Sequence, residues 1–425
     1  MLTLTTLREN RDAIIADFTK RNLDATSLVD EALALDESRR SIQKELDDQL
    51  AEGNKLSKQI GELFKAGDHE SGNKLRGLST DIKETSQKLK EQMTEVELAL
   101  RNVLLQLPNR PHPDVIQGKS DADNEILGQE GDLPKLIDGA VPHWDLCDTY
   151  KLIDFELGVK ITGAGFPVYI GQGARLQRAL INFFLDEARH AGYTEYMPPH
   201  VVNAESGYGT GQLPDKEGQM YYIQADDLYM IPTAEVPLTN IYRDVIVEPT
   251  ELPVKMCGYT PCFRREAGSY GKDVRGLNRL HQFDKVEIVQ IQYPDESYAA
   301  LEVMVDHVKG LLRKLGLPFR TLRLCGGDLS FASALTFDLE VYSAAQERWL
   351  EVSSISNFES FQANRLKCRY RTEDGKTALT HTLNGSALAL PRIVAALLEN
   401  NQVADGIEIP EVLRSYTGFD KITKP

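Results

Sequence analysis

Two stretches near the amino terminus carry the same seven-residue repeat, and this repeat limits what residues 27–105 can fold into. In the first stretch, apolar or small residues recur in steps of four and three: Ile42, Leu46, Gln49, Gly53, Leu56, Ile60 and Leu63. The second stretch keeps the same average spacing: Leu75, Leu78, Ile82, Thr85, Leu89, Gln92, Val96, Ala99 and Val103. Such a repeat predicts left-handed coiled-coil packing. Because the polar turn Gly67–Gly72 separates the stretches, we expect an arm of two antiparallel helices, each roughly 50–60 Å long.

The charge near the tip of this arm has the opposite sign to that of the whole chain. The chain has 48 Lys and Arg against 64 Asp and Glu, a formal net charge of −16, which argues against indiscriminate nucleic-acid binding. Between Lys55 and Lys90, however, basic residues outnumber acidic ones. A basic, elongated arm suits contact with an RNA phosphate backbone. An oligomerisation coiled coil, or an ordinary solvated helix face, is the alternative.

The composition is that of a soluble globular protein with more than one domain. Hydrophobic residues make up 41% and charged residues 26% of the 425 positions, both ordinary values. Charged residues interrupt the first twenty positions, unlike a secretory signal, and no apolar run approaches the roughly 20 residues that span a bilayer. The five cysteines contain no C-x-x-C pair, which favours reduced thiols and no zinc site. We therefore expect a cytoplasmic protein without a membrane-spanning segment.

After the proline-rich stretch Leu107–Pro113, which should end the arm, helices and strands alternate irregularly. Helices are predicted at Leu176–His190 and Ala387–Asn400, and Tyr193–Val202 is predicted to be an edge strand or strand end because it contains two prolines. Further strands are predicted at Leu228–Ile231, Tyr259–Arg264, Phe283–Gln292, Phe319–Leu324, Thr336–Val341 and Leu350–Ser354. Without regular βαβ spacing, this order indicates an α+β fold, an antiparallel sheet flanked by helices. We expect a helical domain at 1–106 and a second domain at 107–425.

Two of these strands carry the residues most indicative of chemistry. Phe263–Glu266 ends one strand, His281–Glu287 belongs to the next, and a loop with Gly268, Gly271 and Gly276 joins them. An arginine such as Arg264 can grip a phosphate through two parallel hydrogen bonds. Glu266 should share its strand face and accept from an adenine amino group, while Phe283 can lie against the purine.

Other nucleotide-binding patterns are missing from the sequence. No G-x-x-x-x-G-K-[ST] occurs, and no G-x-G-x-x-G follows a strand-like run. The residues therefore indicate an ATP site that is not a P-loop. The alternative for Phe263–Glu266 taken alone is a surface strand with a salt bridge.

Further polar residues are candidates for the same site. Thr233 and Glu235 follow a short apolar strand and should share a face, where they offer a hydroxyl and a carboxylate suited to an ammonium group. Glu287 is a carboxylate on the facing strand. Glu351 with Ser353 and Ser354 is suited to a magnesium ion bridging phosphates. Asn384 and Ser386 precede the closing helix, where either is equally explained as an N-cap. Arg392, within that helix, should reach back toward the ligand.

Together these residues closely resemble the seryl-tRNA synthetases, a family of class II aminoacyl-tRNA synthetases, over essentially the whole chain. The resemblance rests on the arm and on Leu7–Asn10, Pro111–Asp114, Gly209–Pro214, Thr233–Glu235, Phe263–Glu266, Arg275–Arg279, His281–Phe283, Glu351–Asn357 and Asn384–Ser386. It implies ATP-dependent activation of L-serine to seryl-adenylate and transfer to serine tRNA, with Mg²⁺ and no tightly bound organic cofactor. It also implies a homodimer joined through the segment from Leu176 to Val202, and an arm lying along the long variable arm of the tRNA. Charging of selenocysteine tRNA depends on the host.

The resemblance further implies roles for single residues. The implied ATP-binding residues are Arg264, Arg265, Glu266, Arg279, Phe283, Glu351, Val352, Ser353, Ser354 and Arg392. Among them Arg264 binds the α-phosphate, Glu266 the adenine amino group and Arg279 the γ-phosphate. Phe283 and Arg392 enclose the base. The implied catalytic residues are Arg264, Glu266, Arg279 and Arg392, and the implied magnesium ligands are Glu351 and Ser354. The implied serine-binding residues are Thr233, Ala234, Glu235, Arg264, Glu287, Asn384 and Ser386. We interpret His281 as structural.

One departure from the family pattern concerns the closing helix. Ala387 and Pro391 stand at two positions where the family usually has glycine, and a proline just before Arg392 removes a backbone donor. We expect a local bend. The rival functions are a class II paralogue that loads a carrier protein, a synthetase for threonine, proline or alanine, and a catalytically inactive RNA-binding descendant.

Overall fold

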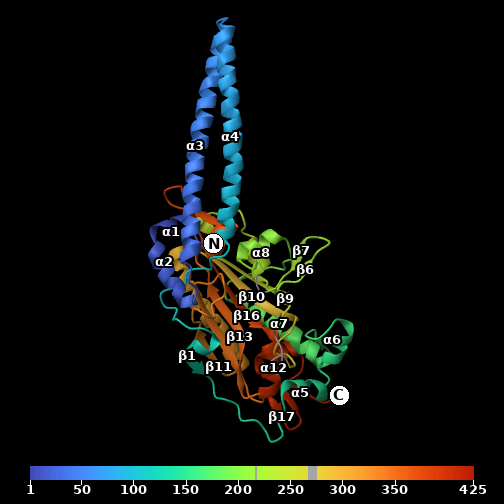
Figure 1. Cartoon of the computed structure of the whole chain (residues 1–425). Helices are drawn as coiled ribbons and strands as arrows, with labels where there is room; N and C mark the ends of the chain where they lie inside the picture. Colours follow the sequence, from blue (N-terminus) through green and yellow to red (C-terminus); the bar gives the residue numbers. More distant parts are fainter. Residues whose placement is uncertain (216–217, 267–274) are drawn as a thin grey trace. The chain divides into compact units, whose positions relative to one another are not determined.

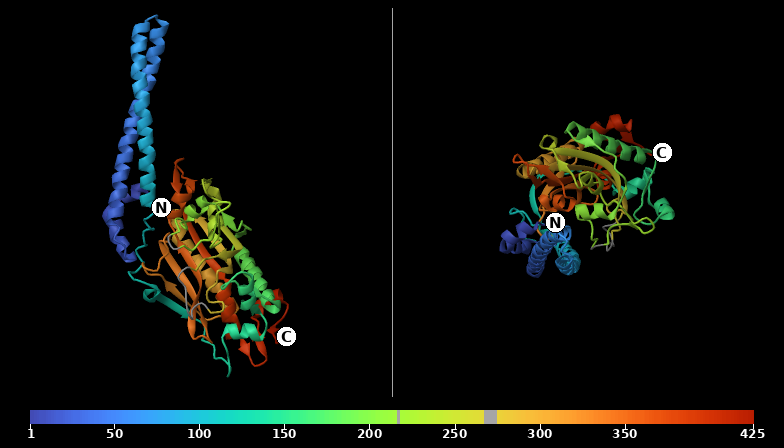
Figure 2. Two further views of the ribbon diagram at one scale, coloured as in Figure 1. Left: turned by 45° about the vertical axis from the view of Figure 1, so that its right-hand side comes forward. Right: turned by 90° about the horizontal axis from the view of Figure 1, so that it is seen from above.

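The computed structural model describes residues 1–215, 218–266 and 275–425, and in it the predicted arm is an antiparallel pair of helices, α3 (Thr26–Lys65) and α4 (His69–Leu104). The two helices lie side by side along their length in Figure 1, and the two further views in Figure 2 show the same arrangement. Two short helices, α1 (Leu4–Glu9) and α2 (Arg11–Phe18), precede them. Residues 2–19 and 23–108 form one compact unit, and residue 1, residues 20–22 and residues 109–425 form the other.

The seam of the arm confirms one predicted column and corrects another. In α3, Leu46 and Leu56 are buried as predicted. In α4, Leu89 and Val103 of one predicted column are buried, whereas Leu78 of the other is 48% exposed. The second buried column of α4 instead contains Ser86, Met93 and Leu100. The predicted positions of this column were therefore wrong by one residue, because both choices satisfy a seven-residue repeat and only the facing helix distinguishes them.

The predicted turn at Gly67–Gly72 is shorter than expected. The Asp68 side chain caps α4 by accepting from the Ser71 backbone N–H at 3.1 Å, so the helix already begins at His69. Gly72 lies inside α4 beneath Phe64. A Cβ atom at Gly72 would lie 3.0 Å from the phenyl ring, so the helices approach closely here because position 72 lacks a side chain.

The second unit is built on one eight-stranded sheet, which confirms the predicted antiparallel architecture. Its strands, in spatial order, are β1 (Glu125–Glu130), β11 (Phe319–Arg323), β12 (Leu335–Ser343), β13 (Arg348–Asn357), β16 (His381–Ala389), β10 (Gln282–Gln292), β9 (Val254–Phe263) and β4 (Thr194–Glu195). All neighbours pair antiparallel except β4, which runs parallel to β9 at the sheet edge. The predicted strand Tyr193–Val202 is thus divided. Its first part is the edge strand β4, and β5 (Val201–Val202) joins a smaller sheet.

Strand β16 was not predicted, and it corrects the interpretation of Asn384 and Ser386. Both residues lie within β16 instead of capping a helix, and α12 (Leu390–Asn400) follows with Ala389 as its N-cap. The run Asn384-Gly385-Ser386 has turn-like composition. Pairing with β10 on one side and β13 on the other overrides that local preference.

Pro391 does not bend the closing helix. It occupies the first turn of α12, where its missing N–H would have no partner within the helix. Arg392 is therefore in the first turn of α12 and not one and a half turns into it, as the predicted start at Ala387 implied.

Helices pack against the sheet and complete a large apolar core. The core combines sheet residues such as Ile288 and Ile355 with residues of the principal helices α7 (Gly171–His190), α10 (Ser297–Leu315) and α12. The remaining helices of this unit are α5 (His143–Thr149), α6 (Phe155–Ile161), α8 (Ala204–Thr210), α9 (Glu235–Asn240), α11 (Ser360–Leu366) and α13 (Glu411–Thr417). Small sheets use β2 (Ile153–Asp154), β3 (Val168–Tyr169), β6 (Tyr222–Ile223), β7 (Leu228–Met230), β8 (Ile246–Val247), β14 (Arg369–Arg371), β15 (Thr377–Leu379), β17 (Gln402–Val403), β18 (Gly406–Glu408) and β19 (Lys421–Ile422). Within the described residues, none of the helices has the length and apolar character that a membrane span requires.

Candidate active site

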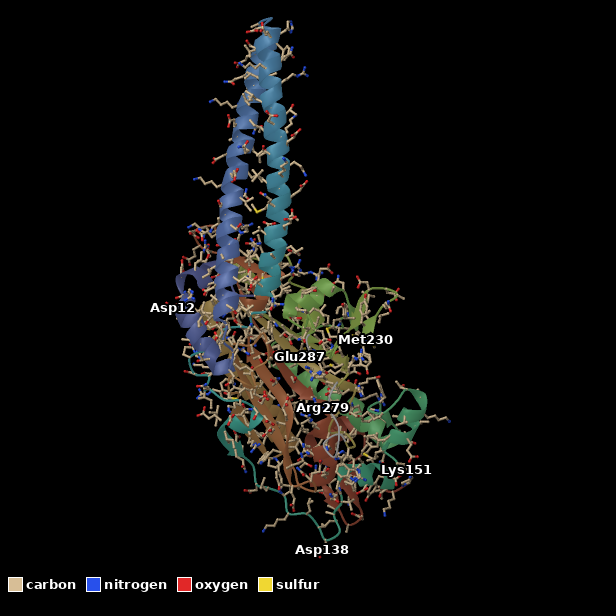
Figure 3. All side chains as sticks on the ribbon, in the orientation of Figure 1. Asp12, Asp138, Lys151, Met230, Arg279 and Glu287 are labelled. Atoms are coloured by element: carbon tan, nitrogen blue, oxygen red, sulfur yellow. The ribbon has the colours of Figure 1, made fainter. Side chains whose placement is uncertain are left out.

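A group of mostly buried polar side chains, which we call the inner cluster, includes residues of the central strands β10 and β16. It consists of the buried Thr233, Glu235, Lys285 and Glu287 and the half-buried Asn384, and Figure 3 labels Glu287 within it. The Thr233 hydroxyl donates to Glu287 Oε2 at 3.1 Å, and Asn384 Nδ2 donates to Glu287 Oε1 and Glu235 Oε2, both at 3.0 Å. Four predicted site residues from three separate segments are thus joined by direct hydrogen bonds.

The route by which Thr233 and Glu235 reach the inner cluster differs from the expected one. Strand β7 ends at Met230, and Glu235 is the first residue of helix α9, with the buried Ala234 as its N-cap. The two side chains therefore do not share a strand face. The helix amino terminus favours a negative charge on Glu235, and its backbone N–H donates to the Thr233 hydroxyl at 3.2 Å.

Two members of this polar network were missed by the sequence reasoning. Lys285 is 4% exposed, forms an ion pair with Glu287 and donates from Nζ to the Thr233 hydroxyl at 2.9 Å. Gln362, from α11, donates from Nε2 to Glu235 Oε1 at 2.6 Å. Lys285 lies two residues before Glu287 on strand β10, so strand periodicity offered a signal. Nothing in the sequence near Gln362 indicates its partner.

The environment of Glu235 changes its acidity. Burial, together with the nearby Glu287 carboxylate, raises the pKa of Glu235 to about 7, although Gln362, Lys285 and Arg264 act in the opposite direction. A buried carboxyl next to a second carboxylate is most easily ionised when a cation approaches. The inner cluster is therefore suited to a ligand that brings an ammonium group and a hydroxyl.

Arg264 follows directly after strand β9 and is near enough to the inner cluster to affect the pKa of Glu235. Its guanidinium carbon is 5.2 Å from the centre of the Phe283 ring, and Nε donates to the Pro232 carbonyl at 3.2 Å. Its backbone N–H donates to the carbonyl of His281, 2.9 Å away. The His281 ring stacks on Phe166 with 5.6 Å between centroids. The interpretation of His281 as structural stays a prediction.

The predicted strand position of Glu266 is wrong. Strand β9 ends at Phe263, and Glu266 has a left-handed backbone with φ of 49°. Its carboxylate forms an ion pair with Arg279 across the base of the loop. Arg265 is exposed, and its N–H donates to the Gln219 carbonyl at 2.8 Å. The predicted loop residues Gly268 and Gly271 lie outside the described residues.

A second group of charged side chains, the outer cluster, consists of Glu266, Arg279, Glu351 and Arg392. Arg279 is labelled in Figure 3. Arg392 donates from Nε to the Asn278 carbonyl at 3.0 Å and from Nη1 to the Glu351 carbonyl at 2.8 Å. A nitrogen of its guanidinium also lies 3.8 Å from the Glu351 carboxylate. Because Asn278 directly precedes Arg279, these contacts of Arg392 bring the chain segments of Arg279 and Glu351 together.

The residues around Glu351 on strand β13 differ in exposure. Val352 is 1% exposed and packs into the main apolar core, and Ser353 donates to the Ser386 carbonyl at 2.6 Å. Ser354 pairs across the sheet with Asp338 on β12. Burial is the main cause, and the negative charge of Glu351 the second, that raises the pKa of Asp338 well above its usual range. Oδ1 of Asp338 has no hydrogen-bond partner among the described residues.

The fold and this arrangement define a class II aminoacyl-tRNA synthetase core. Residues 221–401 match the tRNA synthetase class II core domain (G, H, P, S and T), and residues 1–111 match the seryl-tRNA synthetase N-terminal domain. The serine–tRNA ligase of Salinibacter ruber is 53% identical over 99% of this chain and 99% of its own length. The chain belongs to the seryl-tRNA synthetase family.

Two solved structures of seryl-tRNA synthetases match this chain over its whole length. The seryl-tRNA synthetase from Pyrococcus horikoshii, crystallised with ATP, has a TM-score of 0.92 and 33% identity, with full coverage of both chains. The cytoplasmic serine–tRNA ligase from Naegleria fowleri, in complex with AMP, has a TM-score of 0.87 and 27% identity over 100% of this chain and 99% of that one.

Proposed function

We propose that this protein activates L-serine with ATP to form seryl-adenylate and then transfers the seryl group to serine tRNA. The observation that carries the proposal is the inner cluster, in which Thr233, Glu287, Asn384 and Glu235 form one hydrogen-bonded chain. A serine ammonium group suits Glu235 and Thr233, and its hydroxyl suits Glu287 and Ser386. A site that hydrogen-bonds the hydroxyl rejects alanine, because alanine would leave buried polar groups unpaired.

The nucleotide is proposed to lie against the outer cluster. Arg264 binds the α-phosphate, Arg279 the γ-phosphate and Glu266 the adenine amino group, while the base lies between Phe283 and Arg392. Arg265, Val352 and Ser353 complete the proposed ATP-binding set, and Ala234 belongs to the serine-binding set. The serine carboxylate then attacks the α-phosphorus, the P–O bond to the β-phosphate breaks, and pyrophosphate leaves. Positioning and charge neutralisation govern this step, and no basic side chain is needed.

The donor set near strand β13 fits a magnesium ion. Glu351 and Ser354 offer oxygen ligands of the type that Mg²⁺ prefers. Asp338, which faces Ser354 across the sheet, adds a buried oxygen, Oδ1, that finds no partner in the described part of the chain. We propose that Glu351 and Ser354 hold the ion together with ATP. When bound, the ion supplies neutralisation of phosphate charge.

The arm is the proposed tRNA-binding element of a domain at 1–106, with the catalytic domain at 107–425. Its basic stretch between Lys55 and Lys90 suits the backbone of a long variable arm. Deletion of residues 35–98 should leave serine-dependent ATP–pyrophosphate exchange intact and raise the KM for tRNA by at least about tenfold. Unchanged charging by the shortened protein would remove the proposed role of the arm. We also propose a cytoplasmic homodimer joined through the segment from Leu176 to Val202.

The decisive experiment is ATP–pyrophosphate exchange measured with each amino acid in turn. We expect exchange with serine and none with alanine or threonine. Exchange with another amino acid would refute the specificity, and no exchange at all would favour an inactive RNA-binding protein. A subsequent charging assay with serine tRNA separates a synthetase from an enzyme that loads a carrier protein.

A further inference from the structure

A fully buried histidine and glutamate form a pair that contacts the chain just before Arg279, and the function proposed above uses neither. His143 is the first residue of α5, Glu399 lies near the end of α12, and both are 0% exposed. His143 Nδ1 is 2.7 Å from Glu399 Oε1, and the His143 backbone N–H donates to the same oxygen at 2.9 Å. On the far side of the ring, Nε2 is 2.9 Å from the backbone nitrogen of Leu277.

These contacts fix which imidazole nitrogen carries the proton. The Leu277 N–H is always a donor, so Nε2 of His143 must be unprotonated and accept. Nδ1 therefore carries the proton and donates to Glu399. Although burial acts in the other direction, hydrogen bonds from His143 and Ser343 lower the pKa of Glu399, which keeps it an acceptor.

A second branch of the same network reaches the next residue of the loop base. Gln346 Nε2 donates to Glu399 Oε1 at 3.0 Å, and Gln346 Oε1 accepts from Asn278 Nδ2 at 2.9 Å. The Asn278 carbonyl in turn accepts from Arg392. Glu399 and Arg392 belong to the same helix, α12. This helix therefore holds Asn278, the residue before Arg279, in two ways: through Gln346 at its side chain and through Arg392 at its carbonyl.

The backbone approaches His143 too closely for a side chain. A Cβ atom on Gly276 would lie 2.3 Å from His143 Nε2, and the φ of Gly276 is +66°. The chain from Gly276 to Asn278 therefore packs closely around the imidazole ring. Leu277 is 1% and Asn278 4% exposed.

We propose that His143 is a positioning residue for ATP: its Nε2 accepts the Leu277 N–H and thereby holds Asn278 and Arg279 in register with Arg392. The inference rests on the proposed function, because Arg279 and Arg392 are the proposed triphosphate and base contacts. It requires no contact between His143 and the nucleotide. Loss of the acceptor should therefore weaken ATP binding while leaving the inner cluster, and hence serine binding, unchanged.

Two near-isosteric substitutions separate the two halves of the ring. In His143→Asn, the shorter amide reaches the place of Nδ1, so the contact with Glu399 is kept and the acceptor for Leu277 is lost. In His143→Gln, the longer amide reaches the place of Nε2 and keeps that acceptor. We expect the Asn variant to raise the KM for ATP by about tenfold, and the Gln variant to stay within about threefold of the wild type. The KM for serine should not change in either.

The measurement is serine-dependent ATP–pyrophosphate exchange, with thermal melting of each variant as the control for folding. Equal KM values for ATP in the Asn variant and the wild type would overturn the proposal, as would equal damage by both substitutions. If the Asn variant does not fold, Gly276→Ala replaces it as the test. The added methyl group would push Leu277 away from His143, so this variant must also raise the KM for ATP and leave the KM for serine unchanged. Failure of the proposed function is distinguishable, because the wild-type protein itself would then show no serine-dependent exchange.

Discussion

The inner and outer clusters contain the same kinds of charged side chain but differ in their contact with water. In the inner cluster, Lys285 is 4% and Glu287 0% exposed. In the outer cluster, the Arg279 side chain is 46% and the Glu351 side chain 50% exposed, while their partners Glu266 and Arg392 are 13% and 31% exposed. The inner ion pair is thus part of the protein interior, while the outer charges remain in contact with solvent.

Because of this difference in exposure, similar substitutions in the two clusters should differ in their effects on folding and on ligand binding. A buried ion pair that loses one partner leaves an uncompensated charge in a medium of low polarity, which costs folding free energy as well as binding. A solvent-exposed pair is screened and contributes little to folding. Changes in the inner cluster should therefore affect stability and serine binding together, and changes in the outer cluster should affect ATP alone.

The largest expected effect is at Arg264, which belongs to both the proposed ATP-binding set and the proposed serine-binding set. Arg264→Ala removes the proposed α-phosphate contact and should reduce kcat/KM for exchange by at least about a thousandfold. Arg264→Lys keeps the charge but loses the two-pronged geometry, so it should recover only part of the activity. Pyrophosphate exchange near the wild-type rate in the Ala variant would contradict the assignment of Arg264.

The next largest effect distinguishes the clusters directly by breaking one ion pair in each. Glu287→Gln leaves Lys285 buried without its partner, so the free energy of unfolding should fall by about 3 kcal/mol and the KM for serine should rise by about a hundredfold. Glu266→Gln breaks the pair with Arg279 and should change the free energy of unfolding by less than about 1 kcal/mol. Urea denaturation of both variants measures the difference, and equal losses would abolish the distinction between the clusters.

A smaller effect should appear in the pH dependence of the inner cluster. With its pKa raised to about 7, Glu235 is mostly protonated at pH 6 and cannot attract the serine ammonium group. Between pH 8 and pH 6, kcat/KM for serine should therefore fall by about tenfold, while kcat/KM for ATP stays level. A flat serine profile in exchange assays would contradict the raised pKa.

The same group affects folding in the opposite direction. Because the folded protein holds this proton more tightly than the unfolded chain, whose carboxyl has a pKa near 4.5, rising pH makes the contribution of Glu235 to stability less favourable. The loss falls between about pH 4.5 and pH 7. Comparing the unfolding free energy of the wild type with that of Glu235→Gln across this range isolates it.

The smallest expected effect concerns the aromatic contact of the nucleotide. Phe283→Leu keeps an apolar side chain beside Arg264 but removes the ring face, so the KM for ATP should rise by only about threefold to tenfold. The KM for serine should not change. An equal rise in both values in the exchange assay would indicate that Phe283 supports the inner cluster instead.

Local patterns in the sequence were sufficient for the arm and for the strands that carry the principal site residues. The seven-residue repeat predicted the pair α3 and α4, and the runs Phe263–Glu266 and His281–Glu287 predicted neighbouring strands β9 and β10. The signals fail where two choices are locally equivalent, as for the second buried column of α4. They also fail where composition opposes the fold, as in the turn-like centre of β16.

The sequence by itself therefore determined the family, the helical hairpin and the identity of most residues proposed to bind ATP and serine, because these depend on spacing within short segments. Only the tertiary structure decided which polar groups support them. Strand periodicity places Lys285 on the same face as Glu287, but only the fold brings it to Thr233, and Gln362 reaches Glu235 from another helix. His143 and Glu399 are 256 positions apart. Burial obliges such groups to find partners, but which partner each finds depends on how remote segments pack, and no local pattern records that choice.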